Sequence, residues 1–175
     1  MHKIFFMKKV VFVGSGAIGT AVGNVLARKG IDDITLLSIE EEVVDSINNQ
    51  RLNINYFPNI KLSRNLKATT DIEILKDADV IFMAIPSTAV VGYLFDKKDY
   101  INPKAIIVNL AKGFGKGDCL IPNCLVGHFP NTLMMMKGPS FAREIINRQE
   151  TGFTLACENN ECFSEVADLF ENTNV

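Results

Sequence analysis

The stretch from Lys9 to Thr20, KVVFVGSGAIGT, places an apolar run directly before glycines at G-x-G-x-x-G spacing. The run predicts a buried strand, and apolar residues then recur at helical spacing from Ala17 up to Gly30. A strand, a tight turn and a helix around three glycines are typical of a dinucleotide-binding unit. The alternative is a glycine-rich turn that binds nothing, which does not require a strand before it and a helix after it. The three glycines are expected to permit the sharp turn, the approach of a diphosphate and the packing of helix on strand, and they are Gly14, Gly16 and Gly19. We therefore predict a dinucleotide site, with the diphosphate at the start of the helix.

Composition narrows the class of protein. The chain has 175 residues, 47% of them hydrophobic, which is enough to bury the core of one domain. A net charge of -2, with the two signs interspersed, indicates no basic face for nucleic acid. The four cysteines include no C-x-x-C pair, so metal-ligand spacing is absent and reduced thiols in a cytosolic protein are expected. No apolar run reaches the ~20 residues of a membrane span, and the first nine residues are too short for a signal peptide. We expect a cytoplasmic domain over 8–175, preceded by an amino-terminal extension at 1–7.

Strand and helix patterns alternate along the rest of the chain. Strands are expected over 34–39, 66–70, 79–85, 105–110, 133–136 and 151–157, and helices over 40–49, 72–76, 88–95 and 164–170, with a possible short helix within 114–130. Several of the strands are almost wholly apolar, as strands covered on both faces are. The pattern predicts an α/β fold of the Rossmann type, a doubly wound, mostly parallel sheet with helices on both faces.

The end of the second predicted strand indicates which cofactor is preferred. In this fold the adenosine ribose lies there, and the residues are Ser38, Ile39 and three glutamates from Glu40. No arginine or lysine is present to pair with a 2′-phosphate, and the carboxylates would repel one. Glu40 is placed to accept from the ribose 2′-hydroxyl, or it belongs to the first turn of the next helix, where the dipole favours acids. The sequence favours NAD over NADP.

Other candidate residues follow the later strands. Pro86 and Ser87 either line the cofactor cleft or form a simple turn. Lys112 follows a buried strand where an anionic substrate would meet the nicotinamide, although a solvated loop lysine explains it equally well. Pro139 suits the first position of a helix capped by Gly138, which would present Ser140 at a second anion or polyol site. His128 has no catalytic partner nearby and is expected to be structural or exposed.

The ordered set GSGAIGTA, Asn53 with YFPN, DADVIFMAIPS, NLAKG and KGPSFARE resembles the amino-terminal domain of NAD(P)-dependent glycerol-3-phosphate dehydrogenase, over residues 8–171. The resemblance implies an oxidoreductase that interconverts glycerol 3-phosphate and dihydroxyacetone phosphate and feeds phospholipid synthesis. It also implies roles for individual residues. Those expected to bind the cofactor are Gly14, Gly16, Ala17, Ile18, Gly19, Ser38, Pro86, Ser87, Lys112 and Ala142. Those expected to bind the substrate are Lys112, Gly138 and Ser140.

The sequence departs from that family in three places and in length. Members commonly have an aromatic residue at the position of Ile18, and bacterial ones often have tryptophan at Leu37 and arginine at Ile39; the missing arginine again disfavours NADP. In the family a helical second domain carries the catalytic lysine and the Arg-Asn pair that grips the phosphate. The resemblance therefore predicts a cofactor-binding half that is inactive alone and docks to a helical catalytic domain or forms a homodimer.

Two other functions stay open at this point. One is a non-catalytic dinucleotide-binding or interaction module, motivated by the absence of a general base and by the apolar surface that an undocked domain would expose. The other is a ketopantoate-reductase-like enzyme, which has a similar glycine loop; the GPSFA stretch argues against it.

Overall fold

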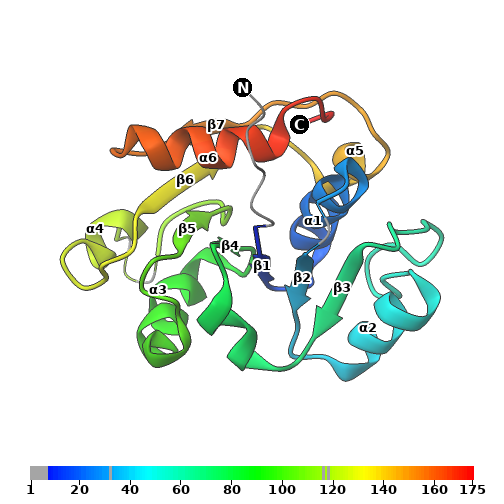
Figure 1. Cartoon of the computed structure of the whole chain (residues 1–175), viewed down its shortest axis with the longest axis horizontal. Coiled ribbons are helices and arrows are strands. Elements are labelled where there is room, and N and C mark those ends of the chain that lie inside the picture. Colours follow the sequence, from blue (N-terminus) through cyan, green and yellow to red (C-terminus); the bar gives the residue numbers. More distant parts are fainter. Residues whose placement is uncertain (1–7, 32, 116, 118) are drawn as a thin grey trace.

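A computed structural model describes residues 8–31, 33–115, 117 and 119–175, and its centre is a seven-stranded sheet (Figure 1). The strand order is β3-β2-β1-β4-β5-β6-β7, and every neighbouring pair is parallel except β6 with β7. The strands are β1 (Val10–Val13), β2 (Ile34–Leu37), β3 (Leu66–Thr69), β4 (Val80–Met83), β5 (Ile106–Asn109), β6 (Leu133–Lys137) and β7 (Thr154–Ala156). The predicted Rossmann-type architecture is confirmed. The expected extension at 1–7 lies outside the described residues.

Helices connect most of the strands. The α-helices are α1 (Ala17–Lys29), α2 (Glu41–Asp45), α3 (Ser87–Asp96), α4 (Ile121–Leu125), α5 (Ala142–Ile146) and α6 (Asn160–Phe170). A π-helical turn (Ser46–Gln50) continues α2, and two 3-10 segments lie at Ile72–Asp77 and Lys98–Tyr100. Within the part of the chain that the structure describes, none of these helices has the length and apolar character needed to cross a bilayer.

Alternation along the strands divides the core into two layers. In β1, Val10 and Phe12 pack in the layer with α1, α5 and α6, while Val11 and Val13 pack in the layer with α3 and α4. Phe12 stacks on Phe82 of β4 with ring centroids 4.6 Å apart, and Phe170 of α6 meets Phe82 edge-on. Figure 1 shows α5 beside α1 and α4 near α3. Helices therefore cover both faces of the sheet, and its strand ends are left for ligands.

The order of strands reverses between β1 and β4. From β1 the chain moves to β2 and β3 on one side and later to β4, β5 and β6 on the other. A crevice forms at such a switch point, beyond the carboxyl ends of the strands. Gly14 directly follows β1 and stands at this point. The fold therefore places the glycine turn at the crevice, where the sequence predicts a dinucleotide.

One predicted helix start is wrong. We expected Gly138 and Pro139 to begin a helix, but α5 begins at Ala142, with Phe141 as the residue before it. The segment between β6 and α5 instead packs against Gly152, because a Cβ on Gly138 would lie 2.3 Å from the Gly152 carbonyl oxygen. This close approach accompanies an irregular loop over 138–141 with a bend at Pro139, which sequence spacing could not reveal.

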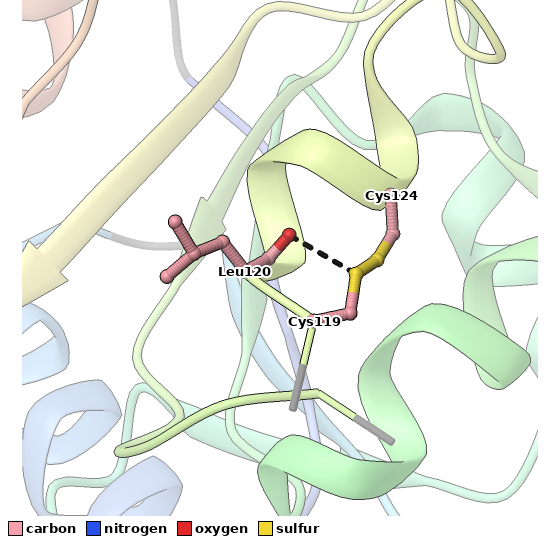
Figure 2. The surroundings of a disulfide bond; sticks show 3 residues. All are labelled: Cys119, Leu120 and Cys124. Carbon is pink, nitrogen blue, oxygen red and sulfur yellow. Dashed lines mark hydrogen bonds between the residues drawn. A yellow bond between two sulfur atoms is a disulfide. The ribbon is translucent and has the colours of Figure 1, made fainter. Parts of the chain in front are cut away.

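The expected state of the cysteines is also wrong in part. Cys119 and Cys124 form a disulfide at the start of α4, with their Cα atoms 6.7 Å apart (Figure 2). The first turn of α4 coils the chain between them and so brings together two side chains five positions apart. Cys157 and Cys162 are free thiols, as expected.

Candidate functional site

The glycine turn between β1 and α1 has little room for side chains at two positions. Gly14 has a φ of +111°, a conformation that residues with a side chain rarely adopt, and a Cβ there would lie 2.7 Å from the Ala84 carbonyl oxygen. A Cβ on Gly19 would lie 2.3 Å from the carbonyl oxygen of Gly14. The sharp turn and the close packing of helix on strand are therefore as predicted.

The start of α1 is suited to an anion. Gly16 is its N-cap residue and has no side chain to bond the free N–H groups of Ala17 and Ile18, and the first turn carries no acidic residue. A Cβ on Gly16 would have only the ring of Tyr56 near it, at 4.0 Å, so the space beside the backbone is open. These N–H groups and the positive end of a thirteen-residue helix fit a diphosphate.

A buried polar network fixes the turn. The hydroxyls of Ser15 and Ser38 are 2.7 Å apart, which joins the turn to the end of β2. Asn53, whose side chain is fully buried, donates from Nδ2 to the Ser15 carbonyl oxygen at 2.8 Å and to the Thr20 hydroxyl at 2.9 Å. The Oδ1 of Asn53 accepts from the backbone N–H of Tyr56 at 3.3 Å. Asn53 stands in the sequence only as part of the motif with YFPN, and that motif predicts no role for its side chain.

The two residues that follow β2, Ser38 and Ile39, carry no charge, and Glu40 is the first charged residue after the strand. Ser38 is buried and its hydroxyl also accepts from the Glu40 N–H at 3.1 Å, so this predicted cofactor residue is held in place from two sides. The side chain of Ile39 is 97% exposed. Glu40 is the N-cap residue of α2, and its carboxylate accepts from the Asn55 side chain at 3.4 Å. Glu40 therefore lies at the strand end, beside the helix start, where both predicted roles put it.

The ends of β4 and β5 lie side by side. Pro86 is the exposed residue before α3, and the half-buried Ser87 is the first residue of that helix. A Cβ on Gly113 would lie 3.5 Å from the Ser87 hydroxyl, so the two loops meet. The predicted cleft residues 86 and 87 are thus brought next to the loop that carries Lys112.

Lys112 is anchored rather than loose. Its Nζ donates to the Ser140 carbonyl oxygen at 3.1 Å and lies 5.2 Å from the centre of the Phe141 ring. Asn109, at the end of β5, accepts from the Ala111 N–H at 3.0 Å and shapes the turn that leads to the lysine. Lys112 is exposed, as a solvated loop residue would be, and its contact with Ser140 joins the loop after β5 to the segment after β6.

The segment 138–142 is built differently from the glycine turn. Ser140 is 1% exposed and its hydroxyl donates to the Gly152 carbonyl oxygen at 2.8 Å. Ala142 is half-buried and begins α5, a helix of five residues. The backbone N–H of Phe141 donates to the Glu144 carboxylate at 3.4 Å, so an acid already lies at the start of this helix. The second anion site expected at a helix N-terminus is therefore not formed by α5.

Lys137 lies at the same edge of the sheet as the segment 138–142, and the sequence pattern did not predict a role for it. It is the last residue of β6, it is half-buried, and its Nζ donates to the Ala111 carbonyl oxygen. Burial lowers the pKa of the Lys137 ammonium group. A lysine directly before GPSFA was the sequence signal that could have indicated this residue. The same lysine is also explained as the end of a strand, with no functional role for its charge. His128 is exposed and packs edge-on against Phe95, which agrees with the structural role expected for it.

The comparisons with known proteins agree with one another. Residues 9–163 match a family model described as NAD-dependent glycerol-3-phosphate dehydrogenase N-terminus. A glycerol-3-phosphate dehydrogenase [NAD(P)+] from Leptospira biflexa is 37% identical over 171 residues, covering 94% of this chain and 51% of that protein. The one from Bacillus subtilis is 34% identical over 174 residues, covering 96% and 50%. The crystal structure of glycerol-3-phosphate dehydrogenase from Coxiella burnetii has a TM-score of 0.87 at 28% identity, covering 97% of this chain and 53% of that chain. The chain thus spans about half the length of the curated relatives it matches.

Proposed function

Since the chain belongs to the family of the NAD-dependent glycerol-3-phosphate dehydrogenase N-terminus, we propose that it contributes one half of a site interconverting glycerol 3-phosphate and dihydroxyacetone phosphate. It is an NAD(P)-binding domain of an oxidoreductase. The activity and substrate of the whole protein are part of the proposal, because the chain covers only about half of its relatives.

The observation that carries the proposal is the shared edge of the sheet. The open start of α1 offers backbone N–H groups for a diphosphate. On the other side of the switch point, Lys112 is fixed by the Ser140 carbonyl oxygen at the ends of β5 and β6. A dinucleotide that extends across this crevice carries its nicotinamide from the first position toward the second.

The residues at the end of β2 favour NAD over NADP. Ile39 presents an apolar side chain to solvent where a 2′-phosphate would need a cation, and Glu40 presents a carboxylate beside it. A carboxylate at the strand end accepts readily from a ribose 2′-hydroxyl and repels a 2′-phosphate. We propose that Ser38 acts through Ser15, whose hydroxyl it contacts, rather than through the cofactor alone.

The chemistry divides between the cofactor and the chain. NAD, when bound, supplies the hydride acceptor for the alcohol or, as NADH, the donor for the ketone. The chain's part is to bind and orient: Lys112 uses one N–H on Ser140 and keeps two for oxygen atoms of the substrate. The alcohol proton needs an acceptor whose pKa lies near the working pH, which desolvation can provide.

Two finer points are proposed with the function. We expect the reaction to take place in the cytoplasm, and we expect its product, glycerol 3-phosphate, to supply phospholipid synthesis. Both are supported by the resemblance of the motifs to the family. The family match does not support the ketopantoate-reductase-like alternative.

One observation favours a second candidate, in which the domain acts by docking. Phe114 and Phe141, on the loops that carry and cover Lys112, are 55% and 63% exposed. Aromatic side chains exposed beside a polar site are typical of interaction surfaces. If docking is the function, the chain should self-associate or bind a helical partner; a strictly monomeric species in light scattering would count against it.

The test is a titration of the purified chain with NADH and NADPH, followed by fluorescence, and then NADH oxidation with dihydroxyacetone phosphate. We expect saturable NADH binding and NADPH binding that is about 10-fold weaker, the ratio expected from one unfavourable charge contact. Failure of both nucleotides to bind would overturn the proposal. In any form of the protein that oxidises NADH with dihydroxyacetone phosphate, Lys112→Ala should sharply reduce the rate of oxidation. Unchanged kinetics would show that Lys112 is not part of the site.

A further inference from the structure

The fully buried side chain of Asn53 joins the glycine turn to the loop that carries Tyr56. Its Nδ2 donates to the Ser15 carbonyl oxygen at 2.8 Å and to the Thr20 hydroxyl at 2.9 Å. Its Oδ1 accepts from the backbone N–H groups of Asn55 at 3.2 Å and of Tyr56 at 3.3 Å. Both donors and both acceptor positions of the amide are therefore used. Exchanging the oxygen and the nitrogen would set an oxygen against the Ser15 carbonyl oxygen, so the contacts specify one orientation of the side chain.

The carbonyl oxygen of Ser15 is fixed from two sides. Besides the bond from Asn53, it accepts one from the Thr20 hydroxyl at 3.0 Å, so both of its lone pairs are occupied. The peptide bond from Ser15 to Gly16 is trans, and in a trans peptide the N–H points opposite to the C=O. Because the carbonyl group points toward the buried Asn53, the Gly16 N–H points away from it.

The N–H of Gly16 has no partner. Among the described residues, none accepts a hydrogen bond from it. The space beside this residue is also open, since a Cβ on Gly16 would meet only the Tyr56 ring, at 4.0 Å. The turn that Asn53 holds therefore presents an unpaired backbone donor at the start of α1. Such a donor gains a partner when an anion binds at the helix start.

We propose that Asn53 is a positioning residue for the cofactor, which directs the Gly16 N–H toward the diphosphate and holds the Tyr56 ring beside it. The inference rests on the proposed function, because that function places a dinucleotide at this turn. Asn53 is buried, so it acts through the Ser15 carbonyl group and through the backbone of Tyr56. A turn that is already ordered loses less entropy on binding than one that the ligand must order.

A merely structural role for Asn53 predicts something different. In that case the amide only joins the loop to the turn, and its loss lowers stability as the loss of any similar amide does. Asn131 is the matched comparison, because it is also buried and its Nδ2 donates to the carbonyl oxygens of Asn102 at 2.9 Å and of Ala105 at 2.8 Å. Ala105 directly precedes β5, at the end of the parallel strands opposite the glycine turn.

The experiment is a calorimetric titration of the chain with ADP-ribose, which carries the diphosphate, on variants whose stability is measured by urea unfolding. Asn53→Asp keeps the oxygen that accepts from the Tyr56 N–H, but an ionised carboxylate cannot donate to Ser15. We expect this variant to weaken ADP-ribose binding about 10-fold or more, the effect of leaving a buried acceptor without its donor. Asn131→Asp should lower the stability and change the affinity by less than about 2-fold.

A spectroscopic signature reports on the direction of the Gly16 N–H itself. In the wild type, the amide proton signal of Gly16 should move downfield when ADP-ribose saturates the chain, because the N–H gains a charged acceptor. The same movement is expected in Asn131→Asp, and a smaller one in Asn53→Asp. A structural role alone would leave the movement the same in all three. The wild-type measurement needs no substitution, so it holds even if Asn53→Asp does not fold.

The outcomes separate the two proposals. Failure of the wild-type chain to bind ADP-ribose overturns the proposed function. If the wild type binds, the positioning role alone is overturned when Asn53→Asp binds as tightly as the wild type, or when Asn131→Asp loses as much affinity. It is equally overturned by a Gly16 amide signal that does not move on saturation of the wild type.

Discussion

The turns after β1 and after β6 resemble each other in sequence, since each has an apolar strand, glycine and then a helical pattern. In the structure the two turns are built differently. After β1 the helix begins within four residues, runs for thirteen and leaves its start open beside Gly16. After β6 four residues of irregular loop, with a bend at Pro139, precede a five-residue helix that has Glu144 at its start. The first turn offers an anion the backbone of a helix, whereas the second begins at the half-buried Lys137, whose Nζ donates to the Ala111 carbonyl oxygen.

The comparison shows what glycine alone specifies. Gly14 and Gly138 both stand where a Cβ would strike a carbonyl oxygen, of Ala84 and of Gly152. In the first case the close approach packs the turn after β1 against the chain that follows β4, and in the second it packs a loop against the segment before β7. What each turn presents then follows from the residues around the glycine, which are the start of a long helix after Gly14 and the ammonium group of Lys137 directly before Gly138.

The largest effect is expected at Gly14. Gly14→Ala should lower the free energy of unfolding by about 2–4 kcal/mol and weaken NADH binding by about 100-fold, because a strained φ and a backbone clash coincide there. Gly30→Ala is the matched control: its φ is +99°, but no atom lies within 4 Å of a Cβ. Urea unfolding and NADH titration measure both variants. Equal losses in the two would show that φ alone matters and that the close approach at the turn does not.

The next effect concerns the strand beside the first turn. Ile39→Arg should strengthen NADPH binding about 10-fold and leave NADH binding nearly unchanged, since a guanidinium group pairs with the 2′-phosphate that only NADPH carries. Ile39→Leu controls for packing. Parallel fluorescence titrations with the two nucleotides measure the change. If Ile39→Arg does not favour NADPH, the adenosine ribose does not lie at the end of β2.

Lys137 gives the second turn a pH dependence that the first turn lacks. Its pKa is lowered by burial, so between that pKa and the ordinary value near 10.5 the unfolded chain binds more protons than the folded one. Stability from this group therefore rises as the pH is raised through that window and is flat below it. The unfolding free energy of the wild type minus that of Lys137→Met should increase with pH there. A difference that falls with pH would show that the ammonium group is not desolvated.

The smallest effect is expected at Glu144. Glu144→Gln should cost no more than about 1 kcal/mol of stability, the usual worth of a helix-start carboxylate, and should change glycerol 3-phosphate affinity by less than about 2-fold. Glu41→Gln, in the first turn of α2, is the control. Affinity measured by calorimetry decides the matter: a large gain in Glu144→Gln would mean that the start of α5 is an anion site blocked by its own carboxylate.

Much of the fold could be predicted from local pattern. The strand after Lys9 and the helix from Ala17 both depend on neighbours in the sequence. The candidate residues at the ends of β1, β4 and β5 could be predicted for the same reason, because parallel strands bring their carboxyl ends to one edge. Prediction of the start of α5 failed, because that start depends on Gly152, fourteen residues beyond Gly138.

By itself the sequence determined the period of each element, the switch from strand to helix at three glycines, and the absence of a cation at the end of β2. These are set by side-chain size, backbone freedom and charge over a few residues. Only the tertiary structure decided that Asn53 holds the glycine turn from 38 residues away, that Cys119 meets Cys124, and that Lys137 reaches the carbonyl oxygen beside Lys112. The physical reason is that a buried polar contact joins whichever groups the packed sheet brings together. The distance in space between two such groups cannot be read from their separation along the chain.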